Sequence, residues 1–260
     1  MYIICMLIAF LACVLGKICG MGGGVIIKPV LDALGVASVS SINFLSGCTV
    51  IGMSLWSVGK SWVRHDSQID LRLSTPLAIG AAAGGILGKS AYSAVAGLFP
   101  SPETAGGVQA VLLLAATFGT LLYTINKDRI RKLHVRNPLA CIVIGFGLGM
   151  LGSFLGIGGG PFNMAVLYFF FAMSTKVAAQ NSLYVILISQ STGLLQTVLS
   201  GRIPEIIPLL LAGMVICGVL GSEIGGRLNR KLSESRTTML FEGAMALVMV
   251  ICVYNIVKFF

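Results

Sequence analysis

The sequence predicts an all-α polytopic membrane protein made of two related halves in opposite orientations. Three observations predict this fold: the composition, the long uncharged stretches, and a glycine-rich motif that occurs twice. Of the 260 residues, 56% are hydrophobic and only 10% are charged, whereas soluble domains are about 25% charged. The composition excludes an ordinary soluble enzyme or a secreted domain, and it makes the lipid bilayer an expected partner.

The charged residues divide the chain into long uncharged stretches. The stretches 104–126 and 177–201 each exceed the roughly 20 apolar residues that cross a bilayer as a helix. The stretch 137–175 is too long for one crossing and must fold back on itself. We therefore expect about eight to ten membrane segments.

A glycine-rich motif occurs once in each half. Residues 16–24 read Gly-Lys-Ile-Cys-Gly-Met-Gly-Gly-Gly, and residues 152–160 read Gly-Ser-Phe-Leu-Gly-Ile-Gly-Gly-Gly. Further along, Asn43 aligns with Asn181. Internal repeats of this kind are typical of secondary transporters.

The two repeats are predicted to span residues 1–126 and 137–260, joined by a basic linker at 127–136. Each is expected to contain a pair of short segments broken at the glycines, followed by three longer helices. The expected segments are 2–19, 24–35, 43–59, 73–97, 105–126, 138–156, 160–174, 181–200, 206–226 and 237–258. The short pair is either two full crossings or a re-entrant hairpin. Both options leave an odd number of crossings per half, so the second half enters the membrane inverted.

The basic residues support inverted halves. With the linker in the cytoplasm, twelve basic residues share its side, and only Arg202 and Lys258 lie in loops or ends on the other. The twelve are Lys60, Arg64, Arg72, Lys127, Arg129, Arg131, Lys132, Arg136, Arg227, Arg230, Lys231 and Arg236. Cytoplasmic loops of membrane proteins are enriched in Lys and Arg, so both termini are predicted to lie outside. The net charge of +9 thus reflects orientation in the membrane, and no nucleic-acid partner is expected.

The paired triple glycines predict the substrate site. Three consecutive glycines cost about 1 kcal/mol each relative to alanine inside a helix, which favours a break. Irregular backbone at membrane depth is tolerated where it is buried in protein or lines a wet cavity, and a helix that restarts there points free N–H groups and its positive end into that cavity. The expected anion site is formed by Gly22, Gly23, Gly24, Gly158, Gly159 and Gly160. The alternative is that the glycines only allow helices to pack closely.

Three lysines lie inside apolar segments, where a charge costs at least about 2.5 kcal/mol. Lys17 and Lys28 bracket the first glycine break and are candidates for attracting the anion. The alternatives are that Lys17 extends toward the membrane interface and that Lys28 pairs with Asp32 one helical turn later. Lys89 is expected to extend toward the outer surface.

Four polar residues complete the predicted site. Asn43 and Asn181 are expected at the starts of the helices that follow the breaks, with Gln180 and Ser182 beside the second. An asparagine at a helix start is first a cap, but a capped helix end that faces a cavity also contacts a ligand. The polar run 189–192 is interpreted as interhelical hydrogen bonding.

The motif copies resemble those of the TauE/SafE family of bacterial sulfite and organosulfonate permeases. The resemblance rests on Gly-Met-Gly-Gly-Gly-x4-Pro-x-Leu at 20–31 and Gly-Ile-Gly-Gly-Gly at 156–160, within a similar length and loop pattern. It implies a secondary transporter without an ATP site that exports small sulfur oxyanions or sulfonates across the cytoplasmic membrane. The second copy departs from the first, because Pro161 follows its glycines and Ala165 stands opposite Pro29.

The residues by themselves favour an anion carrier whose halves rock around a midplane site. An anion channel of the same fold and a carrier of another small anion are the alternatives. A membrane enzyme lacks a nucleophile with its base or a metal-ligand cluster, so neither a cofactor nor a metal is expected. Glu223 and Glu242 are candidates for proton coupling. The anion, the coupling ion, the direction of transport and the choice between monomer and homo-oligomer stay open.

Overall fold

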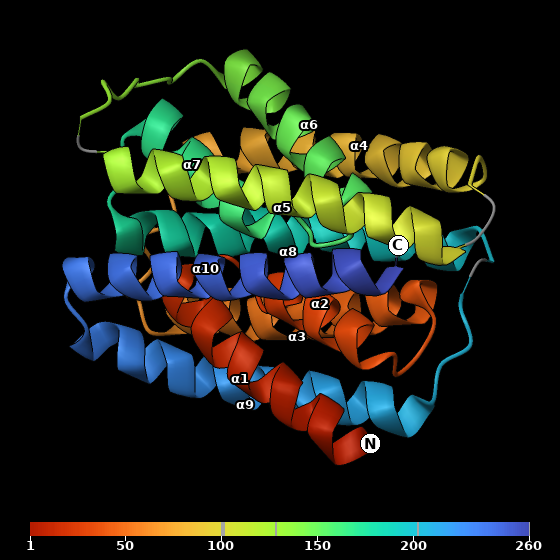
Figure 1. The fold of residues 1–260 in the computed structure, drawn as a ribbon. Coiled ribbons are helices and arrows are strands. Elements are labelled where there is room, and N and C mark those ends of the chain that lie inside the picture. The colour runs from red at the N-terminus through yellow and green to blue at the C-terminus, as the bar shows by residue number, and fades with distance from the viewer. Residues whose placement is uncertain (100–101, 128, 202, 260) are drawn as a thin grey trace.

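The computed structural model describes residues 1–99, 102–127, 129–201 and 203–259, with the backbone alone at 102 and 103. Within this part of the chain all regular structure is helical, and Figure 1 shows the ten helices. They are α1 (Tyr2–Cys19), α2 (Gly24–Leu34), α3 (Val39–Val63), α4 (Leu71–Ala96), α5 (Pro102–Asn126), α6 (Pro138–Phe154), α7 (Gly160–Phe171), α8 (Thr175–Leu199), α9 (Pro208–Lys231) and α10 (Glu234–Phe259). The predicted all-α fold is confirmed.

The helix lengths divide into full and partial membrane segments. Among the described residues, seven helices are long and apolar enough to cross a membrane, namely α1, α3, α4, α5, α8, α9 and α10. By contrast, α2 and α7 have only 11 and 12 residues. At about 1.5 Å per residue, each reaches little more than half of a hydrocarbon core about 30 Å thick. The protein is therefore multi-pass, and the helix that follows each glycine break is a half-length helix.

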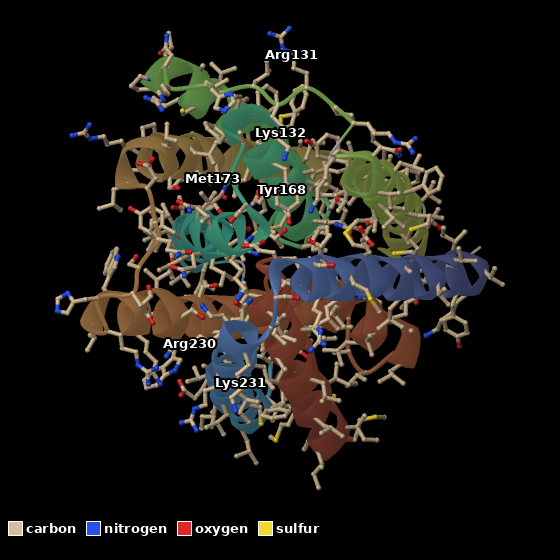
Figure 2. The ribbon with its side chains drawn as sticks, turned by 90° about the vertical axis from the view of Figure 1, so that its left-hand side faces the viewer. Arg131, Lys132, Tyr168, Met173, Arg230 and Lys231 are labelled. Atoms are coloured by element: carbon tan, nitrogen blue, oxygen red, sulfur yellow. The ribbon has the colours of Figure 1, made fainter. Side chains whose placement is uncertain are left out.

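The loops that carry most basic residues lie together at one end of the helix bundle. In Figure 1 this is the left end, where α3, α5 and α9 end and α4, α8 and α10 begin. Figure 2 looks onto this end and shows Arg131 and Lys132 of the linker above Arg230 and Lys231 of α9. Both chain termini lie on the right in Figure 1. We call the basic end the inner end; its cytoplasmic location stays a prediction.

Glycines bring two pairs of helices into backbone contact. A Cβ atom added at Gly84 of α4 would meet the carbonyl oxygen of Phe146 in α6 and lie 2.9 Å from its Cα atom. In the second pair, a Cβ atom added at Gly225 of α9 would lie 2.5 Å from the carbonyl oxygen of Val14 in α1. Small residues allow such close approach in membranes. Each pair joins one helix from each half.

The long helices that follow the breaks begin earlier than predicted. α3 and α8 begin at Val39 and Thr175, so Asn43 and Asn181 lie inside the helices and cap neither of them. The N-cap of α3 is Ser38. The prediction of asparagine caps is wrong because the first turns of both helices extend beyond the apolar stretches from which the bounds were predicted.

The helix bounds also change the correspondence between the halves. α3 and α8 both have 25 residues. Their first residues are separated by the same number of positions as Gly24 and Gly160, the first residues of α2 and α7. Asn43 therefore corresponds to Ala179, and the predicted alignment of Asn43 with Asn181 is wrong by two positions.

Candidate functional site

The first glycine break (residues 20–24) and the second (residues 156–160) contact each other in the interior of the bundle. A Cβ atom added at Gly24 would lie 3.4 Å from the carbonyl oxygen of Ile157 in the other break. One added at Gly160 would meet the carbonyl oxygen of Met21 and lie 2.5 Å from Cγ2 of Val25. All five residues are buried. The N-terminal ends of the two half-length helices therefore converge, one from each half.

The backbone of the breaks requires glycine at matched positions. Gly22 and Gly158 have φ angles of 69° and 72°, in the left-handed region that residues with side chains rarely adopt. A Cβ atom at Gly158 would also lie 2.7 Å from Cδ of Gln190 in α8. The side-chain amide of Gln190 thus packs directly on the second break.

Several backbone donors at the breaks have no hydrogen-bond partner among the described residues. Among the described residues, no hydrogen bond is found for the N–H groups of Gly22, Gly23 and Gly24 or of Gly159 and Gly160. The first N–H groups of a helix have no intrahelical acceptor, and the helix dipole places partial positive charge there. Two such ends in one place form an environment that favours an anion.

A cavity of about 540 Å³, which we call the outer cavity, adjoins the second break. Gly156 and Gly158 form part of its wall, and so do Phe99 and Pro204 near the end opposite the basic loops. Its polar lining consists of Ser40, Asn43, Lys89, Ser90, Tyr92, Ser93, Ser153, Gln190, Gln196, Thr197 and Ser200. The outer cavity therefore extends from that end of the bundle to the glycines.

Three amide side chains in the outer cavity have unused hydrogen-bonding capacity. Oδ1 of Asn43 and Oε1 of Gln196 are buried and have no hydrogen-bond partner in the described part of the chain. No hydrogen bond is found for the side chain of Gln190 within the described residues. Buried polar groups are normally satisfied, and an amide can offer either its oxygen or its N–H groups to a ligand. These amides mark a place for a polar ligand.

Lys89 also faces the outer cavity. Its Nζ donates to the carbonyl oxygen of Gly193 at 3.0 Å and to the hydroxyl of Thr197. The expectation that Lys89 extends to the outer surface is wrong, because acceptors on α8 hold its ammonium group in the cavity wall. Lys89 thereby adds a positive charge to this wall.

A smaller cavity of about 80 Å³, the inner cavity, lies at the basic end. Its basic lining residues are Lys17, Lys60, Arg64, Lys176, Arg227 and Arg230. The carboxylate of Glu223 accepts hydrogen bonds from Lys60, from Nε of Arg227 at 2.9 Å and from Nε1 of Trp56 at 3.0 Å. Among the described residues, the two cavities share no lining residue.

The structure separates the two predicted lysines. A Cβ atom at Gly156 would lie 2.9 Å from Cε of Lys28 and 2.8 Å from Oδ1 of Asn43, so Lys28 reaches the second break. Its Nζ donates to Oδ2 of Asp32 at 2.7 Å, which confirms the predicted pairing. Lys17, by contrast, lines the inner cavity.

The three predicted residues of α8 lie in its inner half. Oδ1 of Asn181 accepts from the N–H of Asp70 and the hydroxyl of Ser74, and its Nδ2 donates to two backbone carbonyls. Oε1 of Gln180 accepts a backbone N–H of the loop before α4 at 2.9 Å. The hydroxyl of Ser182 is buried, and no described residue is a hydrogen-bond partner for it. Gln180 and Asn181 thus fasten this loop to α8.

Gln190 is the residue that sequence reasoning missed. It belongs to the polar run 189–192, which was interpreted as interhelical hydrogen bonding. The run itself was a usable signal, since four polar residues in the middle of a membrane helix need partners. Only the packing of α8 on the second break shows which of the four faces the glycines.

Two comparisons with known proteins each find a membrane transport protein. The chain matches the family described as Sulfite exporter TauE/SafE over residues 5–252. It is 24% identical over 271 residues to a Bacillus subtilis (strain 168) protein named Probable membrane transporter protein YunE, with 95% of each chain covered. No solved structure matches the chain. The family match includes both glycine breaks and all the helices that form the two cavities.

Proposed function

Because the chain belongs to the TauE/SafE family of sulfite exporters and is a membrane transporter, not an enzyme, we propose that it carries small sulfur-containing anions. Sulfite and organosulfonates are the proposed substrates, moved by secondary transport across the bacterial cytoplasmic membrane. One observation carries this proposal: the N-terminal ends of α2 and α7 meet beside the outer cavity. The positive-inside rule places the basic end in the cytoplasm and both termini outside.

The proposed substrate site lies where the outer cavity reaches the second break. The backbone donors proposed for it are the N–H groups of Gly159 and Gly160, which follow the cavity-lining Gly158, and those of the first break, which contacts the second. Asn43 and Gln190 supply amides, and Lys89 supplies a positive charge. A sulfite or sulfonate group carries three oxygens on one sulfur, which suits several converging donors and a nearby cation.

The unequal cavities support alternating access. The outer cavity reaches the second break, whereas hydrogen bonds of Glu223 join α3 and α9 at the inner end. Among the described residues, none lines both cavities, so the two cavities are separate. This conformation therefore favours a carrier over an open channel. Transport then requires the outer cavity to close while the contacts of Glu223 separate.

The helix pairs support the proposal that residues 1–126 and 137–260 are inverted repeats. In one pair, α4 of the first half packs on α6 of the second. In the other, α9 of the second half packs on α1 of the first, which is the same pair with the halves exchanged. Inverted repeats are related by an axis in the membrane plane, and rocking about this axis would exchange the two cavities.

Counterflow of labelled sulfite in proteoliposomes tests the proposed function. Vesicles loaded with unlabelled sulfite should take up the label transiently and saturably, with competition from thiosulfate, taurine, sulfoacetate or sulfate that ranks the substrates. Linear flux without counterflow would indicate the anion channel. Folded protein without any sulfite flux would contradict the proposed substrate and favour a different small anion.

Lys17→Gln is expected to weaken sulfite binding from the inner side. Lys17 lines the inner cavity, and no ion pair is found for it among the described residues. Loss of one unpaired charge near a bound anion should raise the inner KM about tenfold, or roughly 1.4 kcal/mol. The measurement is sulfite uptake in vesicles of known orientation.

Lys231→Gln is the matched control for this variant. Lys231 lies at the same end of the bundle (Figure 2) but does not line the inner cavity. Its replacement should leave the inner KM unchanged. If Lys17→Gln also leaves it unchanged, Lys17 is not on the transport path.

A further inference from the structure

A buried ion pair lies in the middle of the half-length helix α2. Nζ of Lys28 is 2.7 Å from Oδ2 of Asp32, and the two side chains are only 5% and 6% exposed. Oδ1 of the same carboxylate is buried and finds no hydrogen-bond partner among the residues that the structure describes. Removing two charges from water is costly even when they pair. Ionisable residues inside membrane segments are accordingly rare and usually functional.

The second half indicates that the fold does not require this pair. The starts of α2 and α7 align Lys28 and Asp32 with Met164 and Tyr168. Met164 and Tyr168 are fully buried, with exposures of 0% and 2%. The equivalent half-length helix thus packs with uncharged side chains at both positions, so packing does not explain the charges in α2.

The ion pair adjoins the proposed substrate site. Cε of Lys28, Oδ1 of Asn43 and Nε2 of Gln109 would lie 2.9, 2.8 and 3.2 Å from a Cβ atom at Gly156. Gly156 and Asn43 line the outer cavity. Within the described ranges, the Oδ1 atom of Asn43 and the Oε1 atom of Gln109 are buried without hydrogen-bond partners. The pair therefore borders a polar region with unused hydrogen-bonding capacity.

We propose that Asp32 and Lys28 couple proton transfer to anion transport. When Asp32 is ionised, it neutralises Lys28. When the Asp32 carboxylate takes a proton from water, the Lys28 ammonium becomes a free positive charge that attracts the anion. By linkage, bound anion favours the protonation of Asp32 by the same factor. Proton and anion then cross together, and their combined gradients set the direction.

Other ionisable groups also face the carboxylate. Lys258 of α10 donates to the backbone carbonyls of Asp32 at 3.2 Å and Ala33 at 2.9 Å, so both hydrogen bonds go to the backbone and not to the carboxylate. Tyr92 of α4 and Cys252 of α10 lie within electrostatic reach of Asp32. Tyrosine and cysteine side chains are uncharged near neutral pH. Lys28 is therefore the cation whose pairing changes when Asp32 takes a proton.

The inference rests on the proposed function. The Asp32→Asn variant tests proton coupling separately from anion exchange. In proteoliposomes, the wild-type protein should show sulfite counterflow and also initial sulfite uptake driven by an acidic exterior, above that of protein-free vesicles. Asp32→Asn should retain counterflow, while its pH-driven uptake falls to the protein-free rate. Glu205→Gln, the same kind of change at an exposed carboxylate that lines neither cavity, should retain both activities.

A second variant covers the case that unpaired Lys28 prevents folding. Lys28→Gln combined with Asp32→Asn removes both charges and should exchange sulfite with a raised KM, again without pH-driven uptake. Persistent pH-driven uptake in either folded variant overturns the inference alone. Folded variants that lose counterflow as well place the pair in binding and overturn its coupling role. Wild-type protein without counterflow overturns the proposed function and this inference with it.

Discussion

Gln190→Glu is expected to raise the KM for sulfite at least about tenfold, or roughly 1.4 kcal/mol. Gln190 packs on Gly158 and lines the outer cavity. The substitution keeps the size of the side chain but places a negative charge beside the proposed site. Two like charges about 4 Å apart repel by about 4 kcal/mol at an effective dielectric constant of 20. The measurement is the initial rate of sulfite uptake against concentration.

Gln68→Glu provides a matched control for the added charge. Gln68 is exposed in the loop before α4 and lines neither cavity. The same amide-to-carboxylate change there should leave the KM at the wild-type value. A folded Gln190→Glu protein with the wild-type KM would show that sulfite does not bind at the second break.

Gly84→Leu is expected to destabilise the protein more than any substitution in the cavities. The first carbon of the new side chain would meet the backbone of Phe146, so α4 and α6 would have to separate. Overpacking costs about 1–3 kcal/mol where side chains can adjust, and backbone adjusts less than side chains. We expect a loss of about 3 kcal/mol or more, seen as a Tm lowered by about 10 °C or as loss of monodisperse protein in detergent.

Gly147→Leu on α6 is the control for this packing contact. A Cβ atom at Gly147 would meet no described residue within 4 Å, although Gly147 is adjacent to Phe146. Both variants add the same apolar side chain to a membrane helix. Gly147→Leu should stay within about 1 kcal/mol of wild type. Equal Tm values for the two variants would contradict the backbone contact between α4 and α6.

Several predictions from the sequence are confirmed because they depend on local properties. A charged residue is costly in lipid wherever it occurs, so uncharged stretches locate membrane helices without knowledge of their neighbours. The family resemblance and the Lys28–Asp32 pairing also depend only on local sequence. The resemblance needs the motif residues, and the pairing needs a separation of one helical turn. The predicted helix starts were less accurate. α3 begins directly after Ser38, and the first turn of α8 contains Lys176, so both helices begin before the apolar stretches that were used to predict them.

Other features of the site depend on residues far apart in the chain. Lys89 was expected at the outer surface, but acceptors on α8 hold it in the outer cavity. Asn181 was expected in the substrate site, yet its hydrogen bonds go to the loop before α4, to Ser74 in α4 and to Val177 in α8. Gln190 was not selected at all. In each case the side chain contacts a segment distant in the chain, and hydropathy carries no information about which segments touch.

The sequence by itself determined that this chain is a multi-pass helical transporter whose helices break at two triple glycines. Its composition and motifs suffice because the cost of placing each residue in lipid is nearly additive along the chain. The tertiary structure decided that the two breaks touch, that Lys28 reaches the second break while Lys17 lines the inner cavity, and that the larger cavity opens at the end opposite the basic loops. These features follow from close backbone contacts between the two halves, which depend on the shapes of whole helices packed together.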